Sequence, residues 1–209
     1  MKIGVPKEIK SQENRIGLTP ESVKILTSNG NEVLVENNGG FEAGFYNEQY
    51  KSAGAKILDK AEDIFDDAEI IVKVKEPQPS EVKMIKENQI VFTYLHLAAA
   101  KELTKGLVDS KSVCIAYETV TDNNGRLPLL APMSAVAGRM SVQAGAHCLE
   151  KNQKGRGLLL GGAPGVDPGN VVILGGGVVG ENAAIIATGM KAKVHIVDKS
   201  KKRLNELSK

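Results

Sequence analysis

Three side chains suited to binding and protonating small anions follow apolar runs that are typical of buried strands. Arg15 lies in the polar loop after the first such run, Lys75 follows the third, and His96 follows the fourth. Ligands of parallel α/β sheets bind beyond the carboxyl ends of the strands, so we expect these groups to share one rim. A guanidinium, an ammonium and an imidazole on one rim predict a site for a small 2-amino or 2-keto acid.

Each of these residues has a chemical role and a structural alternative. Arg15 can bind a carboxylate through two parallel hydrogen bonds, but it can equally be solvated or salt-bridged. Lys75 can hold a carboxylate or carbonyl oxygen, although Lys73 shares its face and either lysine could be a strand-end charge. His96 can move protons during hydration and collapse of an imine, or it can be a half-buried structural histidine. Glu118, at the end of another run, fits a turn-capping role as well as a catalytic one.

A second chemical pattern, G-x-G-x-x-G, runs from Gly175 to Gly180. It follows the apolar run 171–174, opens a helical pattern, and precedes a strand pattern that ends at Asp198, 18 residues past Gly180. Gly175 permits a tight turn, Gly177 lets a pyrophosphate approach the backbone, and Gly180 lets the helix approach the strand. Asp198 can accept hydrogen bonds from ribose hydroxyls and would repel a 2′-phosphate. The pattern therefore predicts NAD as the cofactor.

Two alternatives to this NAD site stay open. The glycines could form a turn in a purely structural βαβ unit, and the nearby Lys199 and Arg203 could receive the 2′-phosphate of NADP. The cysteines and histidines have no metal-ligand spacing, so we expect no bound metal.

Short apolar runs alternate with helical patterns along most of the chain, which predicts βαβ units and a parallel sheet. The expected strands are 2–5, 32–36, 69–74, 89–95, 113–118, 171–174 and 193–197. The expected helices are 19–30, 47–53, 80–87, 98–109, 132–151, 178–189 and one that begins near 200; a turn at 122–125 could close a small hairpin with 127–130. The predicted fold is α/β, with a parallel-sheet substrate domain (1–130) followed by an inter-domain helix and the first part of a Rossmann dinucleotide-binding domain (131–209).

Composition excludes several other classes of function. The chain has 209 residues, of which 42% are hydrophobic and 25% charged, close to the average of globular proteins. A net charge of +2 favours neither a nucleic-acid nor a membrane-surface role. No apolar run approaches the roughly 18–20 residues that span a bilayer, and the first residues contain no signal-peptide core. We therefore expect a cytoplasmic protein that binds neither nucleic acid nor membrane.

The same residues resemble the alanine dehydrogenase family in several segments. The resemblance covers essentially all 209 residues, and the motifs occur in the family's order. The matching segments are Gly4-Val5-Pro6-Lys7-Glu8, Glu13-Asn14-Arg15, Thr19-Pro20, Lys73-Val74-Lys75-Glu76-Pro77, Tyr94-Leu95-His96-Leu97-Ala98, Leu130-Ala131-Pro132-Met133-Ser134 and Ala137-Gly138-Arg139-Met140.

This resemblance implies NAD-dependent, reversible oxidative deamination of L-alanine to pyruvate and ammonium. By position, Arg15 and Lys75 would bind the substrate and His96 would be the general acid/base. Met133 would border the nicotinamide, and the residues that would join the glycines in contacting NAD are Ser134, Val178, Val179, Asp198 and Arg203. Members of the family usually assemble as homo-hexamers, so we expect a homo-oligomer.

Family members continue well past residue 209. We therefore expect a fragment, an isolated portion or a truncated gene product, without turnover by itself. Two alternative functions are also carried forward. One is the cofactor-binding subunit of nicotinamide nucleotide transhydrogenase, which shares the architecture but needs no amino-acid site; the Lys75 and His96 segments favour the dehydrogenase. The other is a non-catalytic partner of complete subunits.

Overall fold

The computed structural model describes residues 1–208 and divides the chain into two compact units, Met1–Thr121 and Asp122–Lys209. The predicted α/β fold is confirmed, because the first unit contains a six-stranded parallel sheet and the second a parallel βαβ unit. The domain boundary predicted from sequence, between residues 130 and 131, stays a prediction. Among the helices of residues 1–208, none is long and apolar enough to cross a membrane.

The sheet of the first unit has the strand order β3-β2-β1-β4-β5-β6, with every neighbouring pair parallel. The strands are β1 (Lys2–Val5), β2 (Glu32–Glu36), β3 (Lys56–Leu58), β4 (Ile70–Val72), β5 (Ile90–Thr93) and β6 (Val113–Ala116). The order runs one way from β1 and the other way from β4. A crevice for ligands is expected where these two strands end, because their connections leave in opposite directions.

Five α-helices connect these strands, and the first begins as its sequence predicts. They are α1 (Pro20–Ser28), α2 (Asn47–Ser52), α3 (Ala61–Asp67), α4 (Pro79–Val82) and α5 (Lys101–Ser110), with single 3-10 turns at Phe41–Ala43, Leu97–Ala99 and Tyr117–Thr119. Thr19 caps α1 by accepting a hydrogen bond from the Ser22 N–H at 3.3 Å, and Pro20 occupies the first helical position. Both features are common at helix starts.

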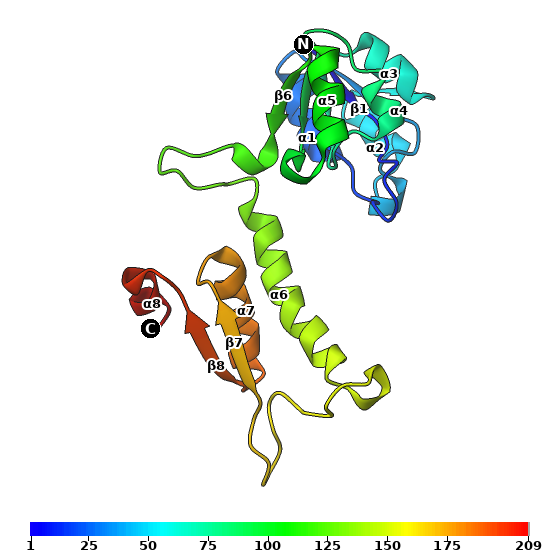
Figure 1. Ribbon diagram of the computed structural model, residues 1–209. Helices are drawn as coiled ribbons and strands as arrows, with labels where there is room; N and C mark the ends of the chain where they lie inside the picture. The colour runs from blue at the N-terminus through cyan, green and yellow to red at the C-terminus, as the bar shows by residue number, and fades with distance from the viewer. Residues whose placement is uncertain (209) are drawn as a thin grey trace. The chain divides into compact units, whose positions relative to one another are not determined.

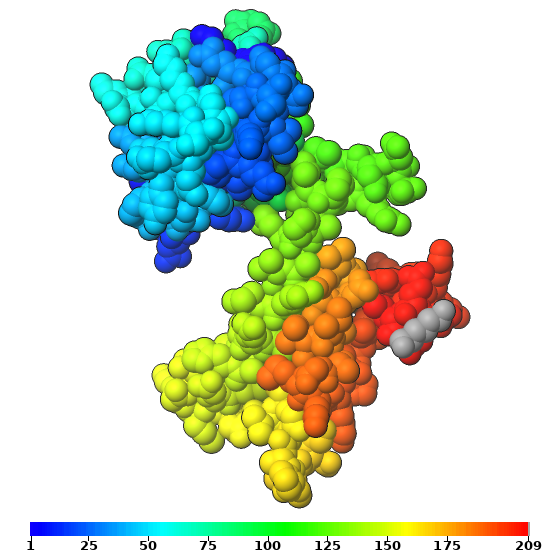
Figure 2. All heavy atoms as spheres, turned by 180° about the vertical axis from the view of Figure 1, so that it is seen from behind, coloured from blue at the N-terminus to red at the C-terminus, as the bar shows by residue number. Residues whose placement is uncertain are grey.

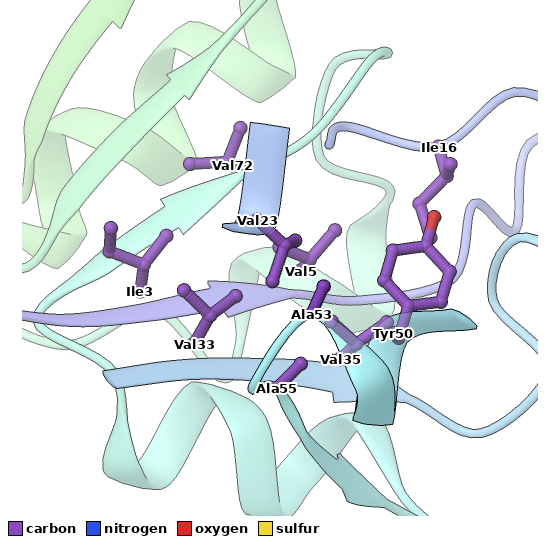
Figure 3. Close-up of a cluster of buried hydrophobic side chains, with 10 residues drawn as sticks. All are labelled: Ile3, Val5, Ile16, Val23, Val33, Val35, Tyr50, Ala53, Ala55 and Val72. Atoms are coloured by element: carbon purple, nitrogen blue, oxygen red, sulfur yellow. The ribbon is translucent and has the colours of Figure 1, made fainter. Parts of the chain in front are cut away.

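The sheet buries side chains on both faces, which explains its near-continuous apolar strands. Val33 and Val35 of β2 belong to one apolar cluster, while Leu34 between them belongs to the cluster on the opposite face. Figure 3 shows the first cluster, in which Val23 of α1 lies beside Val5 of β1; neither is exposed. Burying each such side chain contributes about 1.5–3 kcal/mol. The blue and cyan residues of this unit form a continuous packed surface in Figure 2.

The second unit packs one helix against a two-stranded sheet and a second helix against the first. Its elements are α6 (Ala131–Cys148), a 3-10 turn (Lys151–Gln153), β7 (Asn170–Leu174), α7 (Val178–Gly189), β8 (Lys193–Val197) and α8 (Lys201–Leu207). Helix α7 covers the sheet face that carries Ile173, and α6 lies beside α7 (Figure 1) and adds Val142 to the same apolar cluster. On the opposite face, Val172 and Leu174 are 61% and 82% exposed.

Some elements differ from their predicted form. The turn at 122–125 is present, with the Gly125 N–H donating to the Asp122 carbonyl at 3.0 Å, but 127–130 is not a strand. There the Ala131 N–H donates to the Leu127 carbonyl at 2.9 Å, so the chain turns directly into α6. The predicted strands 69–74 and 89–95 are shorter, as β4 and β5, and the short elements β3 and α3 were not predicted.

A buried ion-pair triad connects the loop after β1 with the segment after β4. The Lys73 side chain is not exposed, and its Nζ lies 3.0 Å from Glu8 Oε2 and 2.7 Å from Glu81 Oε1. Glu8 Oε1 accepts hydrogen bonds from the backbone N–H groups of Val74 (2.6 Å) and Lys75 (3.3 Å). Burial raises the pKa of the Glu81 carboxyl, and the nearby Lys73 ammonium opposes that rise. One cation therefore lies between two buried carboxyl groups.

We expect Lys73→Met to lower the free energy of unfolding by about 3–5 kcal/mol, because it leaves two buried carboxyl groups without a cation. The matched control is Lys2→Met, since Lys2 forms an exposed ion pair with Asp67 at 3.6 Å. That change should cost no more than about 1 kcal/mol. Urea denaturation of both variants measures the difference, and equal losses would contradict this interpretation of the triad.

Candidate functional site

The structure places the predicted substrate-binding residues at the carboxyl edge of the six-stranded sheet. Arg15 lies in the loop after β1, Lys75 follows β4, His96 follows β5, and Glu118 follows β6. The first two come from the strands between which the strand order reverses. This is the position at which parallel sheets bind ligands.

Arg15 shows the two-pronged geometry expected of a carboxylate-binding arginine. Its Nε donates to Glu13 Oε1 at 2.8 Å and its Nη2 to Glu13 Oε2 at 2.6 Å. The hydrogen bond from Arg15 holds the pKa of the Glu13 carboxyl at about 2, so Glu13 is ionised at neutral pH. The salt-bridged alternative for Arg15 is thus the arrangement that the structure shows. The same fork fits the carboxylate of a small acid.

The backbone of Lys75 is held by two hydrogen bonds with other residues. Within residues 1–208, no carboxylate forms a salt bridge with its ammonium. Its N–H donates to Glu8, and its carbonyl accepts a hydrogen bond from Thr93 Oγ1 at 2.9 Å. The Arg15 guanidinium and, less strongly, the Lys75 charge lower the pKa of Glu13. Both cations therefore act on one carboxylate at the rim.

His96 occupies a backbone conformation that few residues other than glycine adopt. Its φ is 51° and its ψ 37°, at the residue before the 3-10 turn Leu97–Ala99. Glu118 stabilises this bend by accepting the N–H of His96 at 2.7 Å and that of Leu95 at 3.1 Å. Burial raises the pKa of the Glu118 carboxyl, but these N–H donors outweigh it and the net shift is downward. Left-handed backbone in a non-glycine residue is often retained at functional sites.

The His96 side chain is exposed, so the half-buried alternative is not what the structure shows. Its ring stacks on Tyr94, with centroids 6.1 Å apart and an interplanar angle of 10°. Tyr94 in turn makes an edge contact with Tyr117 at 4.9 Å. Burial raises the pKa of the Tyr94 hydroxyl, and the nearby Arg15 opposes that rise. Tyr94 therefore interacts with both the imidazole and the guanidinium of the rim.

Sequence reasoning missed three of the residues that organise this rim: Glu8, Glu13 and Tyr94. Two of them carried a usable signal, because side chains two positions apart in an extended chain share a face. Glu13 precedes Arg15 by two positions, and Tyr94 precedes His96 by two. The contact of Glu8 with Lys73 spans 65 positions and has no local signal.

The glycine loop of the second unit has the geometry that its sequence predicts. Gly175 adopts a φ of +98°, which disfavours any side chain. A Cβ on Gly180 would lie 1.9 Å from the Gly175 carbonyl oxygen, so α7 can approach the loop only through glycine. A Cβ on Gly177 would meet no atom of residues 1–208 within 4 Å. The loop thus leaves open space at the amino end of a helix, where phosphates bind.

Asp198 binds the glycine loop directly. Its Oδ2 accepts the Gly176 N–H at 2.6 Å, and its Oδ1 accepts the Ser200 N–H at 2.7 Å. The Ser200 and Gly176 N–H donors lower the pKa of the Asp198 carboxyl. An ionised carboxylate therefore lies beside the loop, which suits ribose hydroxyls and opposes a 2′-phosphate.

Arg203 binds the other side of the same peptide and is already paired with carboxylates. Its Nε donates to the Gly176 carbonyl at 2.6 Å. Its two terminal nitrogens contact Glu181 at 2.7 Å and Glu206 at 3.2 Å. This pairing weakens the NADP alternative, because two carboxylates compete with any phosphate for the guanidinium.

A cavity of about 990 Å³ lies within the second unit. It is lined mainly by residues of α6, β7 and the start of α7, and its wall is largely apolar. The predicted cofactor residues that line it are Ser134, Gly175, Gly177, Val178, Val179 and Gly180. Asp198 and Arg203 do not line it and contact the loop through Gly176.

Comparison with known proteins gives a consistent result along the whole chain. Residues 4–137 match the family model described as alanine dehydrogenase/PNT, N-terminal domain, and residues 141–209 match the C-terminal domain model of the same family. The alanine dehydrogenase of Halomonas elongata is 56% identical over 207 residues, which are 99% of this chain and 56% of that protein. The alanine dehydrogenase of Bacillus subtilis is 53% identical over 207 residues, or 99% of this chain and 54% of that protein. The chain spans slightly more than half the length of these relatives.

Solved structures agree with the sequence matches. An L-alanine dehydrogenase superposes with a TM-score of 0.91 at 54% identity, covering 100% of this chain and 57% of that one. A transhydrogenase from Sinorhizobium meliloti superposes with a TM-score of 0.82 at 23% identity, covering 100% of this chain and 62% of that one, and shows a shared fold. The chain belongs to the alanine dehydrogenase/PNT family.

Proposed function

We propose that the chain supplies the substrate-binding groups and the phosphate-binding loop of an NAD-dependent alanine dehydrogenase. The reaction converts L-alanine, NAD⁺ and water reversibly into pyruvate, ammonium, NADH and a proton. The main support is the rim of Arg15, Lys75 and His96 at the strand-order reversal, in a chain 51–56% identical to alanine dehydrogenases. The relatives' names favour this activity over that of the transhydrogenase, whose likeness is one of fold.

In this proposal the two cations bind the substrate. Arg15 donates two parallel hydrogen bonds to the substrate carboxylate, either in place of its contact with Glu13 or in addition to it. Lys75 contributes a point charge to the carboxylate or to the oxygen of pyruvate. The substrate is thereby oriented by its charged end, which leaves its Cα and amino group near the third residue of the rim, His96.

His96 moves the protons. The glycine loop would hold NAD, which when bound would supply the hydride acceptor for oxidation of the alanine Cα to the imine level. His96 takes a proton from the water that attacks the imine carbon and returns one to the departing ammonia. An exposed imidazole stacked on Tyr94 suits this role, because the ring is oriented yet remains open to substrate.

The residues of the second unit fit NAD. Gly177 leaves space for the pyrophosphate, and Ser134, Val178 and Val179 would contact the cofactor within the cavity. Asp198 would accept hydrogen bonds from the adenosine ribose, with Arg203 beside it. We further propose a homo-oligomer, a hexamer as is usual in the family, located in the cytoplasm.

We expect two substitutions to abolish alanine-dependent NADH formation by the full-length protein in different ways. Lys75→Ala should abolish measurable pyruvate binding, because it removes a cation from the carboxylate site. His96→Ala should retain that binding and lower kcat roughly 10²–10⁴-fold, the usual contribution of acid–base catalysis. Calorimetry with pyruvate and initial-rate kinetics give the two readouts.

The control for this pair is Lys24→Ala, an exposed lysine of α1. It should leave both pyruvate binding and kcat unchanged. The proposed function is wrong if the intact wild-type protein forms no NADH with alanine, or if a transhydrogenation between two nucleotides is its main activity. The non-catalytic alternative gains support if the chain instead co-purifies with a complete paralogue and has no activity of its own.

We expect Asp198→Asn to lower the preference for NAD over NADP at least about tenfold, since it removes the negative charge that opposes a 2′-phosphate. The amide oxygen can still accept one of the two N–H groups that bind Asp198, so the loop should persist with one hydrogen bond fewer. The ratio of kcat/KM for the two cofactors is the measurement. Asp167→Asn, at an exposed carboxylate elsewhere in the unit, is the control, and equal ratios in both variants would contradict the assignment.

A further inference from the structure

Glu8 contacts Lys75, a proposed substrate-binding residue, through the backbone alone. Its side chain is 2% exposed, and one carboxylate oxygen accepts two successive N–H groups, those of Val74 and Lys75. Strand β4 ends at Val72, so these N–H groups do not belong to the β4 ladder. Without Glu8 they would be buried donors without an acceptor, which is unfavourable. Glu8 therefore determines where the backbone of Lys75 lies.

The Lys75 peptide is also held from its opposite end. Thr93 of β5 is fully buried and donates its hydroxyl to the Lys75 carbonyl at 2.9 Å. The N–H and the C=O of Lys75 are thus bound by two side chains from separate strands or loops. A long, flexible side chain such as lysine gains a defined position chiefly from the place and direction of its own Cα–Cβ bond.

The two carboxylates of the buried triad differ in their contacts with the backbone. This difference makes it possible to separate the positioning of Lys75 from the balance of buried charge. Both Glu8 and Glu81 pair with the Lys73 ammonium, at 3.0 and 2.7 Å. Only Glu8 also binds the backbone of residues 74 and 75; Glu81 binds the N–H of Gln78, at the start of α4. Removing either carboxylate leaves one cation with one anion, so the charge effect is matched between them.

We propose that Glu8, together with Thr93, is a positioning residue for Lys75, and that it determines affinity for the carboxylate substrate. This role rests on the proposed function of Lys75. Glu8 does not touch the substrate; it holds the peptide from which the Lys75 ammonium extends. A misplacement of about 1 Å at a reacting or binding group can cost about 10²-fold in rate.

The experiment uses the intact enzyme and compares Glu8→Ala, Glu8→Gln, Thr93→Val and Glu81→Gln. Glu8→Ala and Thr93→Val should each raise KM for pyruvate roughly tenfold or more, with KM for NADH unchanged. Glu8→Gln should show a smaller increase, because its amide oxygen still accepts the two N–H groups. Glu81→Gln should change the pyruvate KM less than about twofold, even if its melting temperature falls as far as that of Glu8→Gln.

A raised KM for pyruvate with an unchanged KM for NADH indicates a loss of positioning. General destabilisation of the protein would instead affect both KM values. If Glu8→Ala does not fold, Glu8→Gln and Thr93→Val decide the question. Equal pyruvate KM values in Glu8→Gln, Thr93→Val and Glu81→Gln would overturn the positioning role while the proposed function stands. Absence of alanine and pyruvate turnover in the wild-type enzyme would overturn the proposed function itself, and this role with it.

Discussion

The ion pair of the buried Lys73 ammonium is the interaction on which the candidate site depends. A charged group that is removed from water needs a counter-ion at close range. Lys73, after β4, pairs with Glu8, after β1, and the strand order reverses between these two strands. That requirement draws the loop after β1 onto the end of β4. Arg15 lies in the first of these segments and Lys75 in the second. Apolar packing forms the sheet beneath them, and the Glu8–Lys73 ion pair links the two segments that carry these cations.

Several elements could be predicted from the sequence almost to the residue. β1, β2, α7 and β8 have the predicted bounds. β3 and α3 were missed, since each offers only two adjacent large apolar residues, Ile57-Leu58 and Ile64-Phe65, among polar ones. Lys73 and Lys75 could not be separated by pattern, because alternate residues of an extended chain share a face. The early end of β4 at Val72 separates them: Lys73 is buried, and Lys75 stands at the rim.

Some contacts that shape the candidate site join residues far apart in the chain, and for that reason sequence alone did not reveal them. Glu118 supports the backbone of His96 from 22 positions away, a turn-capping role that the sequence left equal to a catalytic one. Local chemistry could be predicted, as with the glycine loop, because Gly175 and Gly180 follow from turn geometry and close approach. Support from distant side chains depends on the fold already being formed.

Asp198 shows how one carboxylate can couple recognition to architecture. Its carboxylate accepts the N–H groups of Gly176 and Ser200. The group suited to ribose therefore also stabilises the glycine loop and the start of α8. A substitution at this position therefore acts on both properties together. Replacing the carboxylate removes a hydrogen bond from the turn as it weakens the preference for NAD, so a full change to a phosphorylated cofactor would also need a new acceptor for the freed N–H group. The two properties are in this sense epistatic.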